Sequence, residues 1–318
     1  MKPWPVRHAG RAISIVAAIG LLSAACAAQV LRGTALDDEL PAIVDLGHGL
    51  SVISAHELHG PRLGGVSAVT GSADELILFS DRGDVWQVGV ERAADGQISQ
   101  LAPWQELDLP ELPMPYLDVE SATATADGIA LAFERNHAIT ELRVENGQLA
   151  FDDRITQHGD LDVLPINGGI EAMASIDNHW LLIAEQAYAA DGNAQAFWVK
   201  NGEFVTASYA VADGFSATAA DATSSHLIIL ERSLSLLAGW RARLSIVPLE
   251  RLQPGSDQPI VPQRSWVIPA SVPVDNMEAL KAIERRDGLL ELLLLSDDNF
   301  NVLQRNLLLQ MTLDVSGL

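Results

Sequence analysis

Acidic residues recur at matched places along this sequence, and their type and spacing suggest a site for chemistry. Glu120 and Glu134 lie 14 residues apart around an Asp-Gly pair, and Glu171 and Glu185 keep the same spacing. Further segments repeat the plan and contain Asp81, Glu231, Glu278, Asp297 and Asp298. Carboxylate oxygens in this number suit a hard cation such as Ca²⁺ or Mg²⁺ better than a transition metal. The pattern therefore predicts a divalent-cation site, and calcium is the ion we expect.

Arginines accompany these acids, because Arg82, Arg135 and Arg232 each directly follow one of them. A metal beside fixed guanidinium groups can polarise and clamp a phosphate ester. We predict that the catalytic residues are Glu171, Glu278, Arg232, Arg135 and Arg82. We predict that the metal ligands are Asp81, Glu120, Glu134, Glu185, Glu231, Asp297 and Asp298. The structural alternative is that these groups form ion pairs and hydrogen bonds that hold neighbouring repeats together.

Short apolar runs separated by turn residues occupy most of the chain after about residue 40. Asp95-Gly96, Asp127-Gly128, Asn146-Gly147, Asn201-Gly202 and Asp287-Gly288 are dipeptides that favour tight hairpin turns. No long stretch shows an apolar period of 3.6 residues, which a helix would require. The sequence predicts an all-β protein.

Five segments share one internal plan, and their openings are separated by roughly 46 to 61 residues. This is the length of a four-stranded blade, so the repeats predict a β-propeller. The second repeat fits strands near 120–125, 129–134, 138–144 and 149–154. The segments 43–54 and 305–315 would supply a further, shared blade, so we favour six blades over five or seven. A solenoid is the rival architecture, but its repeats are usually shorter.

Residues equidistant from a hairpin turn face each other across the two strands. Pairing Ser67 with Asp81 and Ala217 with Glu231 gives the spacing of 14 that Glu120 and Glu134 show. We therefore expect the two marked positions of each repeat to lie side by side at the open end of a hairpin. The second position is acidic in all five repeats, and the first in three. Five equivalent hairpins would gather these groups at one mouth of the central channel.

The charge balance restricts the partners of the protein. Its 318 residues include 42 acids and 20 Lys and Arg, giving a formal net charge of −22. Such a surface repels phosphate backbones, so we expect no nucleic-acid binding. A small-molecule substrate, or an anionic substrate complexed with metal, suits the charge better. We expect a monomer.

The N-terminus has the features of an export signal. Basic residues precede an apolar run from Ala12 to Ala25 that is shorter than a membrane span. The lone cysteine, Cys26, follows a sequence similar to a lipoprotein box, and a lipid there would be the only membrane attachment. We expect a signal peptide at 1–28, a linker at 29–42 and the propeller domain at 43–318. The predicted location is the periplasm, the outer membrane as a lipoprotein, or the medium.

Several of these motifs together resemble the family known for the esterase-like activity of phytase. The matching segments are Gly169-Ile-Glu171-Ala-Met173, Asn276-Met-Glu278-Ala-Leu280, Leu230-Glu231-Arg232 and Leu295-Ser296-Asp297-Asp298-Asn299-Phe300, followed by Gln304 and Gln310. The resemblance covers roughly residues 50 to 315. It implies an exported, phytase-like propeller domain with an esterase or phosphoesterase activity. Ser67 and Ala217-Thr218 depart from the pattern, since other repeats place Glu there.

These observations leave three hypotheses open. The protein is a metal-assisted hydrolase of phosphate or other esters, a non-catalytic propeller that binds a ligand or protein at the cell envelope, or a lactonase-like calcium propeller. No Gly-x-Ser-x-Gly motif occurs, which argues against an α/β-hydrolase route to ester cleavage. The sequence alone does not decide whether the protein is an enzyme.

Overall fold

A computed structural model describes residues 35–40, 42–60, 62–109, 118–126, 128–145, 148–151 and 158–318. Strands dominate this part of the chain, and its only helices are two short 3₁₀ segments, η2 (Gly159–Val163) and η3 (Leu249–Arg251). The predicted all-β class is confirmed. No helix in the described ranges is long and apolar enough to cross a membrane. The predicted signal peptide and Cys26 lie outside the described residues.

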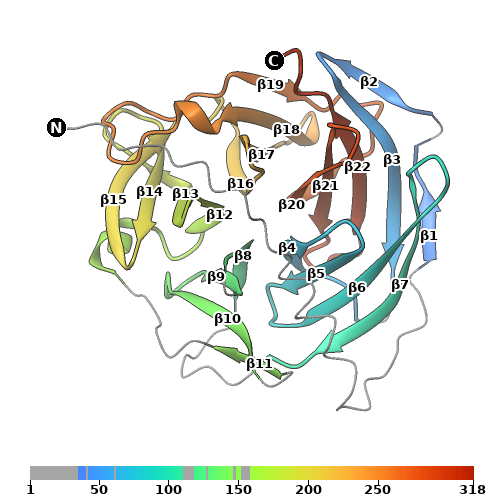
Figure 1. The fold of residues 1–318 in the computed structure, drawn as a ribbon, viewed down its shortest axis with the longest axis horizontal. Coiled ribbons are helices and arrows are strands. Elements are labelled where there is room, and N and C mark those ends of the chain that lie inside the picture. The colour runs from blue at the N-terminus through green and yellow to red at the C-terminus, as the bar shows by residue number, and fades with distance from the viewer. Residues whose placement is uncertain are drawn as a thin grey trace.

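Five sheets surround a central axis, so the fold is the predicted β-propeller (Figure 1). Blade 1 contains β4 (Val66–Gly71), β5 (Glu75–Ser80), β6 (Val85–Arg92) and β7 (Ile98–Leu107). Blade 2 contains β8 (Val119–Ala124), β9 (Ile129–Phe133), β10 (Ile139–Glu145) and β11 (Gln148–Phe151). Blade 3 contains β12 (Ile170–Ile176), β13 (His179–Tyr188), β14 (Ala194–Lys200) and β15 (Glu203–Tyr209). Blade 4 contains β16 (Ser216–Ala222), β17 (His226–Ser235), β18 (Gly239–Pro248) and β19 (Arg264–Val267).

The fifth blade closes the ring, and it shows why the favoured number of six blades was too high. It contains β20 (Asn276–Glu284), β21 (Leu290–Asp297), β22 (Leu307–Leu313) and the N-terminal β3 (Leu50–His59). The segments assigned to a further blade thus join the fifth repeat, because β3 pairs antiparallel with β22. Two short strands, β1 (Ala35–Asp38) and β2 (Val44–Gly47), pair with β3. β1 lies within the segment that we assigned to the linker.

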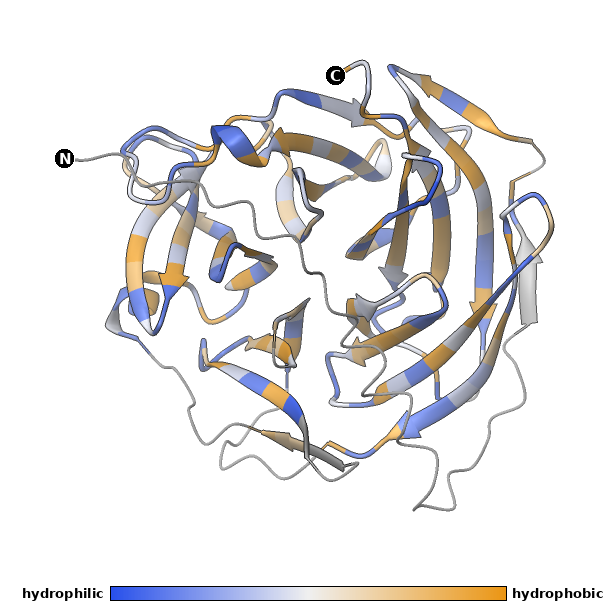
Figure 2. Ribbon diagram, viewed as in Figure 1, coloured by the Kyte–Doolittle hydropathy of each residue, from blue (hydrophilic) through white to orange (hydrophobic). Residues whose placement is uncertain are grey.

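Each blade buries both faces of its sheet against its neighbours, which explains the long apolar runs in the sequence. Five apolar cores form, one between each pair of adjacent blades. All eight residues of β21 are buried, as expected for a strand covered on both sides. Figure 2 shows hydrophobic residues concentrated on the strands of every blade. Burial of this apolar surface is the main source of stability.

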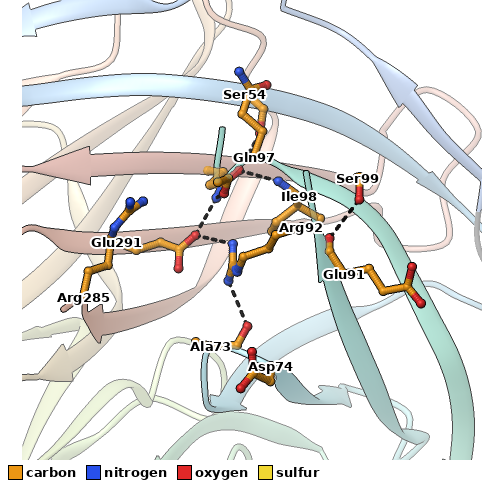
Figure 3. A network of polar contacts seen from close by, with 12 residues as sticks. Ser54, Ala73, Asp74, Glu91, Arg92, Gln97, Ile98, Ser99, Arg285 and Glu291 are labelled. Atoms are coloured by element: carbon orange, nitrogen blue, oxygen red, sulfur yellow. Dashed lines mark hydrogen bonds and ion pairs between the residues drawn. The ribbon is translucent and has the colours of Figure 1, made fainter. Parts of the chain in front are cut away.

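A polar network ties the closing blade to blade 1 (Figure 3). Arg92 of β6 donates to the Glu291 carboxylate of β21 at 2.6 Å and to the Ala73 carbonyl at 2.9 Å. Gln310 of β22 donates to Glu291 at 2.5 Å and accepts from the Ile98 N–H of β7 at 2.9 Å. Glu291 is 2% exposed, so its charge is compensated by Arg92 inside the fold. The network secures the junction between the first and last blades.

Candidate functional site

A β-bulge occurs at the same place in every innermost strand. The register between the first two strands of each blade shifts at Ser67, Glu120, Glu171, Thr218 and Glu278. A bulge leaves one residue without a cross-strand partner and redirects its side chain. These five residues are therefore equivalent positions without a partner across the hairpin. Ser67 and the three glutamates line the central channel, whereas Thr218 donates to the Met277 carbonyl of blade 5 at 2.9 Å.

The bulges correct our expectation that the two marked positions of each repeat face each other, which holds only in the fourth repeat, where Ala217 pairs with Glu231. The backbone N–H of Glu134 donates to the Asp118 carbonyl at 2.9 Å, so Glu134 lies opposite Asp118 and not Glu120. Asp81 likewise lies opposite Gly65, and Glu185 opposite Gly169. In these three repeats symmetry about the turn failed because the inner strand contains one extra residue.

The fourth repeat is shifted by one residue from its predicted alignment. Its bulge falls at Thr218 instead of Ala217, so Ser216 pairs with Arg232 and Ala217 pairs with Glu231. Arg232 therefore occupies the position that is acidic in the other four blades. A shift of one residue sends a strand side chain to the opposite face of its sheet. The expected acid at the second position of all five repeats is wrong, because blade 4 supplies a guanidinium there.

Glu231, which we predicted as a metal ligand, consequently points into blade 4. It is 0% exposed and forms an ion pair with Arg243 of β18. Tyr209 and Ser245 donate to its Oε1 at 2.5 and 2.7 Å. Burial and the Glu231 carboxylate raise the pKa of Tyr209 well above its usual value, which keeps this donor protonated. The arrangement supports the structural alternative for Glu231.

Arg232 connects three blades at the mouth of the channel. Its guanidinium donates to Glu278 and Asn276 of blade 5 and, at 2.8 Å, to Glu185 of blade 3. Burial lowers the pKa of Arg232, but the carboxylates of Glu278 and Glu185 outweigh it and raise the pKa above its usual value. The predicted catalytic residues Arg232 and Glu278 are thus brought together as an ion pair.

The bulge glutamates line a narrow passage at the centre of the ring. Glu120, Glu171 and Glu278 surround a cavity of about 10 Å³, together with Ser67 and small residues of the inner strands. This is about the space that one water molecule needs. Burial, and then the Glu185 carboxylate, raise the pKa of Glu171 well above its usual value. The channel walls therefore contain carboxyl groups that keep their protons to unusually high pH.

A compact acidic cluster lies in blade 2, where Asp118, Glu120 and Glu134 bring ligand oxygens within 4.8 Å of one another. Burial, and then the charge of Glu171, raise the pKa of Glu120 well above its usual value. Burial also raises the pKa of Glu134, although its carboxylate accepts the Gly168 N–H at 2.5 Å. Among the described residues, none donates a hydrogen bond to the Glu120 carboxylate. Oxygen ligands so close together form a candidate cation site.

Asp118 is the member of this cluster that our site prediction missed. It precedes the bulge by two residues, and the corresponding residues of blades 1 and 3 are Gly65 and Gly169. The sequence did offer a signal for Asp118, because the second repeat opens with an acid where the first and third repeats open with glycine. It could not be interpreted without the bulge, which places Asp118 opposite Glu134.

The other predicted residues surround the cluster or support loops. Arg135 pairs with Asp118 at 2.8 Å and is half exposed, whereas Arg82 stacks on the Phe300 ring at 3.4 Å. Asp298 accepts the N–H groups of Gly65 and Phe300, both at 3.0 Å, so it orders the loop between β21 and β22. These contacts place both arginines at the mouth.

Asp81 and Asp297 occupy the second position in blades 1 and 5. Burial raises the pKa of Asp81, and the charge of Asp118 contributes in the same direction. Burial, and then the Glu278 carboxylate, raise the pKa of Asp297 to about 8. Acidic groups therefore accumulate on the side of blades 1, 2 and 5, while the half-buried guanidinium of Arg232 belongs to blade 4.

The fold and this mouth define an acidic five-bladed propeller with a candidate cation site. The sequence matches the family model described as phytase-like, esterase-like activity of phytase, over residues 61–300. The chain belongs to this family, as its motifs predicted. No protein of curated function matches the sequence.

Two solved structures illustrate the wider similarity. Glutaminyl cyclase from Myxococcus xanthus shares 9% identity with a TM-score of 0.46, covering 84% of this chain and 97% of its own. The GH43 endo-arabinanase from Bacillus licheniformis shares 10% identity with a TM-score of 0.41, covering 76% and 92%. Similarity at this level carries no information on function.

The buried ion pairs of Arg232 can be tested by Arg232→Met. The change leaves the Glu278 and Glu185 carboxylates without their cation, so the free energy of unfolding should fall by about 3–5 kcal/mol. Urea denaturation measures this, and Arg286→Met, at an exposed site, should change it by less than about 0.5 kcal/mol. Adding Glu278→Gln to Arg232→Met should recover part of the loss. Equal stability of Arg232→Met and wild type would contradict this role.

The raised pKa of Asp297 predicts a pH-dependent stability. Between about pH 4 and pH 8 the folded protein binds a proton that the unfolded chain releases, so its stability falls as the pH rises. Asp297→Asn should therefore be more stable than wild type at pH 8, by roughly 1–3 kcal/mol, and equal to it near pH 4. Denaturation in a chelator across this range measures the difference.

Asp314→Asn provides the control for this pH series. Hydrogen bonds from Ser316 lower the pKa of the exposed Asp314, so its replacement should show the opposite sign, with wild type the more stable at pH 8. A pH-independent difference between Asp297→Asn and wild type would show that Asp297 has no raised pKa.

Proposed function

We propose that this protein hydrolyses phosphate or other esters at the acidic mouth of its channel, with calcium as the cofactor. The observation that supports this most directly is the approach of the Asp118, Glu120 and Glu134 oxygens to within 4.8 Å of one another. Calcium binds oxygen ligands at about 2.3–2.6 Å, so two ligands of one ion lie at most about 5 Å apart. The residues of the cluster fit this ion in both chemistry and spacing.

The charge of the cluster supports the same assignment. Burial, and then the neighbouring acids, raise the pKa of Glu120 and disfavour its ionisation, and no described residue donates to its carboxylate. A bound divalent cation would offset this repulsion, polarise a phosphoryl or carbonyl oxygen and lower the pKa of a bound water. Asp118, Glu120 and Glu134 would hold it.

Neighbouring residues supply the other roles. Glu171 faces the channel and keeps its proton to higher pH than an ordinary glutamate, so it suits a general acid that protonates the leaving group. Arg232 donates to both Glu278 and Glu185, so it positions these carboxylates and places a fixed positive charge beside the channel. Arg135 is half exposed at the mouth and is the guanidinium that an incoming anion would meet.

A binding propeller without catalysis is the second candidate, and one surface feature favours it. Leu236 and Leu237 are fully exposed at the tip of the β17–β18 hairpin, and Val302 and Leu303 are exposed in the β21–β22 loop. Both connections follow strands that end at the mouth. Exposed apolar residues on neighbouring loops are typical of surfaces that bind a partner.

We also propose that the protein acts outside the cytoplasm, as its N-terminal sequence predicts. Fractionation of cells that express the full chain should recover it from the periplasm, the outer membrane or the medium. Recovery of the uncleaved chain from the cytoplasm would contradict this location.

Isothermal titration calorimetry of the purified protein with calcium tests whether calcium is the cofactor. Wild type should bind calcium, and Glu120→Gln should weaken binding at least about tenfold because it removes a charged ligand. Turnover of 4-nitrophenyl phosphate and 4-nitrophenyl acetate should be lost in EDTA. Glu171→Gln should bind calcium but lower kcat by about 100-fold, since it cannot donate a proton.

Glu203→Gln, on an exposed outer strand, is the matched control and should behave like wild type. Undiminished turnover in EDTA, or no calcium binding by wild type, would contradict the proposed mechanism. Calcium binding without turnover of any ester would favour the binding propeller.

A further inference from the structure

A surface pocket of about 470 Å³ lies on blade 3, between β13, β14 and the connection from blade 2, and Gln186 joins it to the acidic mouth. This volume is within the range of small-molecule sites. Its walls are formed by Val163, Pro165, Gln186, Ala187, Tyr188 and Gln195, with the two alanines that follow Tyr188. None of these residues is charged, in a chain that carries 42 acids. The pocket is therefore an uncharged region beside a strongly acidic one.

The first wall of the pocket is held in place by the surrounding structure. Val163 ends η2, which begins after His158, and the His158 ring stacks on Phe204 of β15 with centroids 4.5 Å apart. Leu161 and Leu164 on either side of Val163 are buried in the core between blades 2 and 3. A wall fixed in this way costs little conformational entropy on binding.

The second wall connects the pocket to the candidate cation site. Gln186 lines the pocket, and its side chain donates to Glu185 of the mouth at 3.0 Å. Its backbone N–H donates to the Gly168 carbonyl at 3.0 Å, and the Gly168 N–H donates to Glu134 at 2.5 Å. Gly168 has φ +82°, and an added Cβ would lie 2.6 Å from Gln186. Gln186 and Gly168 thus connect the pocket to Glu134 through two consecutive hydrogen bonds.

We propose that this pocket binds the uncharged, apolar or aromatic group of an ester whose anionic group binds at the acidic cluster. The proposal rests on the proposed function and specifies its substrate class. Tyr188 is 62% exposed and offers an aromatic face, and Val163 is 67% exposed on the opposite wall. The glutamine amides supply hydrogen-bonding groups without charge.

The same geometry disfavours a substrate with many phosphate groups. The pocket has no lysine or arginine, and the mouth arginines Arg82, Arg135 and Arg232 are not among its lining residues. A second phosphate in the pocket would therefore lie near the mouth acids without a compensating cation. The substrate that fits has one anionic group and one apolar group.

Equilibrium binding of phenylphosphonate and methylphosphonate to the calcium-saturated protein tests the pocket. Wild type should bind phenylphosphonate about tenfold more tightly, because only the phenyl group reaches the apolar walls. Val163→Asp should abolish this preference. Val302→Asp makes the same change at a valine that is 98% exposed in the β21–β22 loop, and it should leave the preference intact.

Binding of 1-naphthol, measured by its fluorescence, separates the pocket from the cation site because this probe has no anionic group. Val163→Asp should weaken it at least about fivefold, whereas Glu120→Gln should leave it unchanged. Loss of calcium binding with retained naphthol binding would contradict the proposed function and support the pocket. Equal affinities of wild type for the two phosphonates, or equal naphthol binding by Val163→Asp and Val302→Asp, would overturn the pocket proposal.

Discussion

The burial of many carboxylates around one narrow channel is the constraint on which this structure depends. Each blade brings polar groups to the same mouth, and like charges at this density would oppose closure of the ring. Arg232 relieves the repulsion because its guanidinium binds Glu278 and Glu185 on the two neighbouring blades. The ion pairs join blades 3, 4 and 5 at the mouth.

The position of that cation divides the mouth into two unlike halves. Around blade 4 the carboxylates are paired, with Glu231 enclosed by Arg243 and Tyr209. Around blades 1 and 2 negative charge is in excess, and Asp118 adds a carboxylate where blade 1 has glycine. Among the described residues, a propeller of five similar blades thereby has one candidate cation site rather than a uniform ring. The unequal distribution of acids and arginines, and not the number of acids, distinguishes this cluster from the rest of the mouth.

The uncharged pocket beside the cluster adds to this asymmetry. The connection between blades 2 and 3 contributes Gly168 to the cluster and Val163 to the uncharged pocket. A single segment thus positions a hydrogen-bond donor for Glu134 and an apolar wall beside it. For the proposed ester substrates, the adjacent charged and uncharged surfaces would determine which ester binds.

The sequence by itself determined the all-β class, the propeller and the family, because hairpin turns and blade-length repeats are local signals. It also predicted the strands of the second repeat to within a few residues and identified Glu120, Glu134 and Arg232 as members of one mouth. Five blades in place of six followed from the pairing of β3 with β22, which joins distant segments. Only the tertiary structure decided which side chains face the channel, because one bulged residue in each inner strand reverses the faces. In blade 4 the bulge falls at Thr218, so Glu231 points into the blade and Arg232 lies at the mouth.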